Sequence, residues 1–108
     1  MGDLPEPMEI LDLQPGGVAR FRVMRYEEGE AVIKPRRAPG GVWVNVLRVH
    51  VDMRDKPSFP YYFDITSKTL RAQLLPLIKA SKPGFLMFRI TKQGIGPQAR
   101  FKVESAPA

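Results

Sequence analysis

The sequence predicts a mostly β domain, with five strands and a single helix between the third and fourth strands. Runs of alternating or densely β-branched residues recur along the chain, and Gly- and Pro-rich breaks separate them. Only the stretch after Thr66 places its apolar residues at helical spacing. With 108 residues, the chain is long enough for one domain with a single core.

Residues 1–14 are predicted to form an acidic N-terminal arm. Four acids precede Arg20, the first base: Asp3, Glu6, Glu9 and Asp12. Two prolines oppose regular structure, and the apolar end of the arm, from Met8 to Leu13, could dock on the body. One hypothesis places these carboxylates in or near a basic groove as a weak mimic of a polyanion. The alternative is a disordered tail or a protein-docking segment.

Residues 15–104 are expected to form the domain itself. Val18 to Tyr26 alternates well enough for a first strand. Glu27 to Glu30 predicts a turn, after which a short return strand follows. Lys34 to Gly41 contains two prolines, two glycines and three cations, which predicts a basic loop.

A dense β-branched run from Val42 to Asp52 predicts a strand that lies in the middle of the sheet or is covered on each side. A short third strand follows at residues 61–65. Thr66 or Ser67 is expected to cap a helix, which Pro76 should kink or split. The apolar stripe of that helix consists of Leu70, Leu74, Leu75, Leu77 and Ile78.

The last part of the chain, residues 85–104, predicts a hairpin whose turn carries Gly94, Gly96 and Pro97. Alternation directs Phe101 and Val103 toward the core and leaves Arg100 and Lys102 together on a basic face. Residues 105–108 are expected to be a frayed tail.

The charge balance predicts a polyanionic partner. The chain has 17 Lys and Arg against 11 Asp and Glu, a net +6. Because four of the acids lie in the arm, residues 13–108 have seven acids against all 17 bases, a net +10. Such a field favours nucleic acid over an anionic membrane surface, since no apolar run approaches the ~20 residues of a spanning helix. No signal peptide is recognised, so a cytoplasmic location is expected.

Residue types also exclude several chemistries. The chain has no cysteine and one histidine, which excludes disulfides, thiolate metal sites and histidine-rich metal sites, and no cofactor is predicted. KQGIGPQ lacks the spacing of a phosphate-binding P-loop. Asp52, Asp55 and Asp64 near one histidine are typical of surface charge, so no enzyme activity is predicted.

Five strands with one helix between the third and fourth is the element order of the OB-fold, a small Greek-key barrel. A family resemblance is carried by three stretches: WVNVLRVHVD, YYFDITSKTLRAQLLPL and FRITKQGIGPQARFKVE. In these stretches the chain resembles prokaryotic and viral-type OB-fold single-stranded-DNA-binding proteins. The resemblance implies binding of single-stranded nucleic acid, DNA in preference to RNA, with low sequence specificity. The strand would lie across the second and third β-strands, between the first inter-strand loop and the loop joining the last two. The insertion at residues 34–41 and the acidic arm depart from that pattern.

Candidate binding residues combine cations for phosphates with aromatic rings for bases. They are Lys34, Arg36, Arg37, Trp43, Arg48, Tyr62, Arg89, Lys92, Arg100 and Lys102. Tyr62 is preferred over Tyr61 as the outward ring because Phe63 and Ile65 alternate toward the interior. For Arg48, a structural role stays open beside the functional one. An alternative function is that of an adaptor or structural subunit, in which the barrel binds a protein partner or a second copy.

Overall fold

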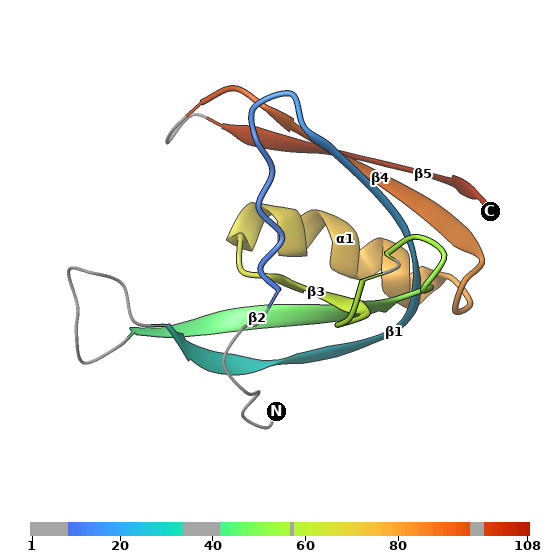
Figure 1. Ribbon diagram of the computed structural model, residues 1–108, viewed down its shortest axis with the longest axis horizontal. Coiled ribbons are helices and arrows are strands. Elements are labelled where there is room, and N and C mark those ends of the chain that lie inside the picture. Colours follow the sequence, from blue (N-terminus) through green and yellow to red (C-terminus); the bar gives the residue numbers. More distant parts are fainter. Residues whose placement is uncertain (1–8, 34–41, 57, 96–98) are drawn as a thin grey trace.

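The computed structural model describes residues 9–33, 42–56, 58–95 and 99–108. Its elements are β1 (Val18–Ile33), β2 (Val42–Val51), β3 (Tyr62–Ile65), α1 (Lys68–Ala80), β4 (Leu86–Gln93) and β5 (Arg100–Pro107). All strand pairs are antiparallel, and the strands form one sheet in the order β3-β2-β1-β4-β5 (Figure 1). The predicted class, mostly β with a helix between the third and fourth strands, is confirmed.

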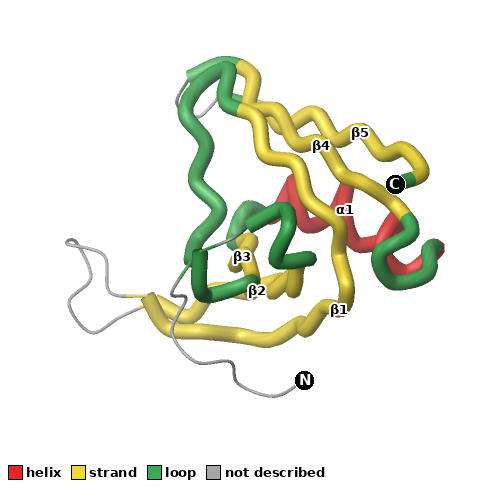
Figure 2. The backbone as a smooth tube through the Cα atoms, turned by 45° about the vertical axis from the view of Figure 1, so that its right-hand side comes forward, coloured by secondary structure: helices red, strands yellow, loops and turns green. Residues whose placement is uncertain are grey.

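The long strand β1 belongs to both halves of this sheet. Residues 23–33 pair with β2, and residues 18–22 pair with β4. A register shift between Val23 and Arg25 lies close to the point where one partner replaces the other. Residues 23–33 with β2 and β3 are called half-sheet A below, and residues 18–22 with β4 and β5 half-sheet B. The two half-sheets lie on opposite sides of α1, as the tube in Figure 2 also shows.

The turn predicted at Glu27 to Glu30, with a separate return strand after it, was wrong. β1 continues through these residues, and Gly29 is buried opposite Val46 of β2. Three acids around a glycine resemble a turn in the sequence, but in a paired strand their side chains alternate between the two faces. The loop predicted at residues 34–41 lies outside the described residues.

The core lies between the half-sheets and α1. The central strand predicted at residues 42–52 is confirmed as β2, which lies between β1 and β3 and directs Leu47, Val49 and Val51 inward. From β1 and β4, Phe21 and Phe88 meet in this core, with ring centroids 6.4 Å apart. Full burial of each such side chain contributes about 1.5 to 3 kcal/mol to folding.

Helix α1 covers the core with its predicted apolar stripe. Its N-cap is Ser67, whose hydroxyl accepts a hydrogen bond from the Leu70 amide at 3.3 Å. Leu70, Leu74 and Ile78 are buried, at the spacing of one helix face. Pro76 does not split the helix, which continues to Ala80. Proline removes a single i to i−4 hydrogen bond, and the buried stripe extends beyond it on both sides.

The sheet does not close, so the predicted Greek-key barrel is not confirmed. Among the described residues, β3 and β5 are its two edges and do not pair with each other. Instead, the N-terminal segment occupies the β3 edge: the Asp64 amide donates to the Glu9 carbonyl at 2.8 Å, and the Leu11 amide donates to the Asp64 carbonyl at 3.0 Å. Helix α1 reaches the other edge, where the Gln73 side-chain amide donates to the Phe101 carbonyl at 3.0 Å.

Both ends of the described chain therefore belong to the body. Leu11 and Leu13 pack against the core, as the docking interpretation of the arm requires, whereas residues 1–8 lie outside the described residues. The frayed tail predicted at residues 105–108 was wrong, because β5 runs to Pro107 and pairs with β4 as far as Leu86. The amide of Ala108 also donates to the Phe85 carbonyl at 2.9 Å.

Candidate nucleic-acid interface

The structure does not bring the candidate binding residues onto one face. Lys34, Arg36 and Arg37 lie outside the described residues. Trp43, Arg48 and Tyr62 belong to half-sheet A, whereas the remaining candidates belong to half-sheet B: Arg89, Lys92, Arg100 and Lys102. Since the half-sheets flank α1 on opposite sides, their outward faces point away from each other (Figure 1).

Arg48 is committed to a buried ion pair. Its Nε lies 2.6 Å from Oδ1 of Asp64 and its Nη2 lies 3.1 Å from Oδ2, and the exposed fractions of the two residues are 6% and 0%. The hydrogen bonds to Asp64 raise the pKa of Arg48 above its ordinary value, so the guanidinium stays charged. Arg48 thus has the structural role that the sequence left open, and a phosphate would have to displace Asp64 to reach it.

The rest of this outer face is also charge-paired. On β1, Glu27 lies opposite Arg48 in register, and its Oε2 is 3.2 Å from Nε2 of His50. Arg25 contacts the other oxygen of Glu27 at 3.3 Å. The hydrogen bond with His50 lowers the pKa of Glu27. This face therefore presents little uncompensated positive charge.

Tyr62 is not the open stacking surface that was predicted. Its ring is half-buried, with the Arg48 guanidinium carbon 4.2 Å from the ring centroid and the His50 ring 5.6 Å away. The predicted inward direction of Phe63 and Ile65 is confirmed, because Ile65 is buried and Phe63 packs against Phe21 with centroids 5.3 Å apart.

The exposed aromatic rings lie elsewhere. Trp43, near the start of β2, is 59% exposed, Phe59 and Tyr61, in the loop before β3, are 78% and 37% exposed, and Phe85, just before β4, is 56% exposed. Phe59 and Tyr61 meet edge to face, with centroids 6.0 Å apart. Strand alternation could not assign Tyr61, because the strand begins only at Tyr62.

The loop that carries Phe59 and Tyr61 is anchored at its base. Asp55 accepts hydrogen bonds from the Arg22 amide and Nε, both at 3.0 Å, and from Nη2 at 3.1 Å. Lys56 is buried and donates to the carbonyls of Ser58 and Pro60. The prediction that Asp55 and Asp64 are surface charges was therefore wrong. Asp52 does stay near the surface, where Arg54 lowers its pKa to about 2.

Uncompensated cations gather on the outward face of half-sheet B. Alternation along the three strands places four of them there, called the cation face below: Arg20, Arg89, Arg100 and Lys102. All four are exposed. Among the described residues, the three arginines have no ion-pair partner, and Nζ of Lys102 lies 3.9 Å from Oε1 of Glu104. The predicted shared face of Arg100 and Lys102 is confirmed.

The pairing of β1 with β4 places two cations of this face next to each other, which is unfavourable unless an anion lies close to them. Arg20 and Arg89 are direct cross-strand partners, and like charges in that position repel. Arg89 in turn lies opposite Glu104, the one carboxylate in these rows. Lys92 is half-buried and lies opposite the inward residue Phe101, so it does not belong to the cation face.

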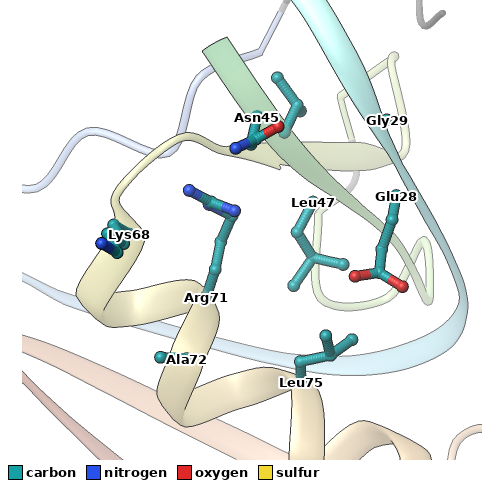
Figure 3. Close-up of a pocket in the computed structure, with 9 residues that line it drawn as sticks. Glu28, Gly29, Asn45, Leu47, Lys68, Arg71, Ala72 and Leu75 are labelled. Atoms are coloured by element: carbon teal, nitrogen blue, oxygen red, sulfur yellow. The ribbon is translucent and has the colours of Figure 1, made fainter. Parts of the chain in front are cut away.

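A cavity opens between α1 and the part of the β1–β2 hairpin that extends beyond it (Figure 3). Its polar lining residues are Glu28, Asn45, Lys68 and Arg71. The sequence did not predict this site, because Glu28 lay in a predicted turn and no strand was expected opposite the helix there. The spacing of Lys68, Arg71 and Leu75, which share one helix face, was the available signal.

No family model, curated protein or solved structure matches the chain. In the described part of the molecule, no three His, Asp or Glu side chains are grouped so that they could hold a metal ion. None of the helical structure described is long and apolar enough to cross a membrane.

Proposed function

We propose that the protein binds single-stranded nucleic acid, DNA in preference to RNA, with little sequence discrimination, and that its cation face holds the phosphates. The observation that carries this proposal is the set of exposed arginines on β1, β4 and β5 that have no ion-pair partner in the described part of the chain. A polyanion that lies across these strands would relieve the repulsion between Arg20 and Arg89. It would also release the counterions that those cations otherwise attract.

The proposal treats the fold as an OB-type barrel that is open between β3 and β5. Five strands with the helix between the third and fourth support this interpretation. The resemblance to OB-fold DNA-binding proteins implied a strand across β2 and β3. We place the phosphates on half-sheet B instead, because Arg48 on β2 is buried against Asp64.

We base the preference for single strands on exposed rings outside the cation face, which a strand would reach where it extends beyond half-sheet B. Trp43 and Phe59 project into solvent, and a ring stacks on a base only where that base is not already stacked in a duplex. No helix is placed among the cations of half-sheet B to enter a major groove, so readout of paired bases is not expected from this face.

The test is a fluorescence titration with labelled oligo-dT, its RNA equivalent and a duplex, each at two salt concentrations. Arg89→Gln with Arg100→Gln should weaken oligo-dT binding on the order of tenfold at 0.1 M salt. The slope of log K against log salt should fall by about 1.4, which is roughly 0.7 for each lost phosphate contact.

Lys79→Gln serves as the matched control, because Lys79 is an exposed cation in the last turn of α1, outside the cation face. The Lys79→Gln variant should leave the slope of log K against log salt almost unchanged. Equal or tighter binding to duplex would contradict the single-strand preference. An unchanged slope in the double variant would show that Arg89 and Arg100 are solvated charges only.

Self-association is a second candidate function, favoured by Phe59, which is 78% exposed on a loop anchored through Arg22, Asp55 and Lys56. Exposed aromatic residues on rigid supports are frequent energetic centres of protein interfaces. Sedimentation equilibrium should then show an oligomer that Phe59→Ala weakens and that salt affects little. A monomer at all concentrations would eliminate this candidate.

A further inference from the structure

The cavity beside α1 has an apolar floor and polar walls of opposite charge. It has a volume of about 310 Å³, and Leu47, Ala72 and Leu75 form much of its apolar lining. Figure 3 shows Arg71 rising from α1 toward Asn45, with Glu28 of β1 on the far side of Leu47. A flat ring with hydrogen-bonding edges is the kind of ligand that such a site accommodates.

One donor of Arg71 lacks an acceptor among the described residues: its Nε is buried and has no hydrogen-bond partner. Within the described residues, neither Arg71 nor Glu28 has an ion-pair partner, although they line the same cavity. Buried donors in folded proteins are almost always satisfied, so an unsatisfied one indicates a missing acceptor. Two unpaired groups of opposite sign therefore point to a ligand that carries both acceptors and donors.

The cavity and one residue of the cation face, Arg100, both border the first turns of α1. Arg100 lines a shallow hollow together with Thr69 and Gln73 of α1. Lys68 and Arg71, on the neighbouring side of the same helical turns, line the cavity. A strand whose phosphates contact Arg100 could thus pass over the first turn of α1 and place a base in the cavity.

We infer that this cavity is a nucleobase pocket that selects guanine in the bound strand, an inference that rests on the proposed function. Guanine presents two acceptors, O6 and N7, that match the two parallel donors of Arg71. Its N1–H and N2–H₂ donors match the carboxylate of Glu28. Adenine places a donor where guanine has O6, and the pyrimidines lack N7. Adenine and the pyrimidines therefore cannot hydrogen-bond fully to both Arg71 and Glu28. The ring face packs on Leu47 and Leu75.

The test compares a 17-residue oligo-dT with three oligonucleotides that carry a single central dG, dA or dC. The dG oligonucleotide should bind on the order of tenfold more tightly than the others, the discrimination expected from one bidentate contact. Glu28→Gln should reduce this ratio to about one. The same variant should bind oligo-dT slightly more tightly, because a carboxylate that repels phosphates is removed.

Glu30→Gln is the matched control, because Glu30 lies on the same strand and the same face two residues further on, but does not line the cavity. It removes the same charge and should keep the guanine preference.

Salt-dependent binding with equal affinity for all four oligonucleotides would overturn the pocket and leave the proposed function standing. If the dA oligonucleotide binds as tightly as the dG oligonucleotide, the guanine assignment is also overturned. If oligo-dT does not bind but the dG oligonucleotide does, the pocket stands and the cation face is wrong. No binding of any of them overturns both.

Discussion

The outward faces of the two half-sheets both carry cations, but they differ in what those cations contact. On half-sheet A, Arg25 and Arg48 each contact a carboxylate, that of Glu27 or Asp64. On half-sheet B, Arg20, Arg89 and Arg100 have no such partner among the described residues. A net positive charge therefore does not locate a binding face; the distribution of ion-pair partners does.

The reason for the difference lies at the β3 edge. Residues 9–11 bond to this edge, and Asp64 beneath them is fully buried. A buried carboxylate is tolerated only when it is paired and hydrogen-bonded, so half-sheet A must supply a cation. On half-sheet B, Arg22 pairs with Asp55 at the junction of the two half-sheets, whereas Arg20, Arg89 and Arg100 have no ion-pair partner among the described residues.

The largest expected effect is that of Asp64→Asn, which leaves the Arg48 guanidinium buried without a counter-charge. The free energy of unfolding should fall by about 3 to 5 kcal/mol, a large share of the roughly 5 to 15 kcal/mol of an ordinary domain. Urea denaturation at pH 7 measures it. Replacing both partners, Arg48→Met with Asp64→Leu, should recover most of the loss. If Asp64→Asn is as stable as the natural chain, the pair is not structural.

A chain that begins at Pro15 tests whether the N-terminal segment closes half-sheet A or competes for the cation face. It loses the packing of Leu11 and Leu13 and the backbone hydrogen bonds to Asp64. The free energy of unfolding should fall by about 3 kcal/mol, since both leucines are only partly buried. A chain that begins at Glu9 is the control and should keep this stability. Unchanged stability with tighter binding at low salt would instead support the arm as a competitor of nucleic acid.

Asp55, at the junction of the two half-sheets, should give a smaller and pH-dependent effect. Its hydrogen bonds with Arg22 lower its pKa below the value of about 3.9 in the unfolded chain. The stabilisation is therefore complete above that value and is lost as the pH falls through the lower pKa of the folded state. Asp55→Asn should cost about 1 kcal/mol at pH 7, after allowance for solvent screening. Thermal unfolding from pH 7 to pH 2 should show this difference shrinking, and a constant difference would contradict the assignment.

The smallest effect on stability is expected on the cation face. Arg89→Gln with Arg100→Gln removes exposed charges without partners, so the free energy of unfolding should change by no more than about 0.5 kcal/mol. Loss of the repulsion between Arg20 and Arg89 could even raise it slightly. Urea denaturation at pH 7 measures the free energy of unfolding of this double variant. A loss above about 1 kcal/mol would mean that these arginines are structural, like Arg48, and would remove the contrast between the half-sheets.

Features that depend on neighbours along the chain were predictable from the residues alone. The period of two in residues 100–103 separated cations from core residues, and the β-branched run predicted β2. The hydroxyl residues Thr66 and Ser67 before an apolar helical stripe predicted a cap, which the structure assigns to Ser67. These features arise from local backbone geometry and side-chain direction, which a short window of sequence contains.

Tertiary structure alone decided which charges are free and where a cavity lies. Arg48 and Asp64 are 16 residues apart in the chain, and only the register of β2 with β3 places them in contact. Likewise, Glu28 and Arg71 line one cavity only because β1 continues past its predicted end and extends beside α1. The availability of a charged group depends on what surrounds it in space, and long-range strand pairing sets those surroundings.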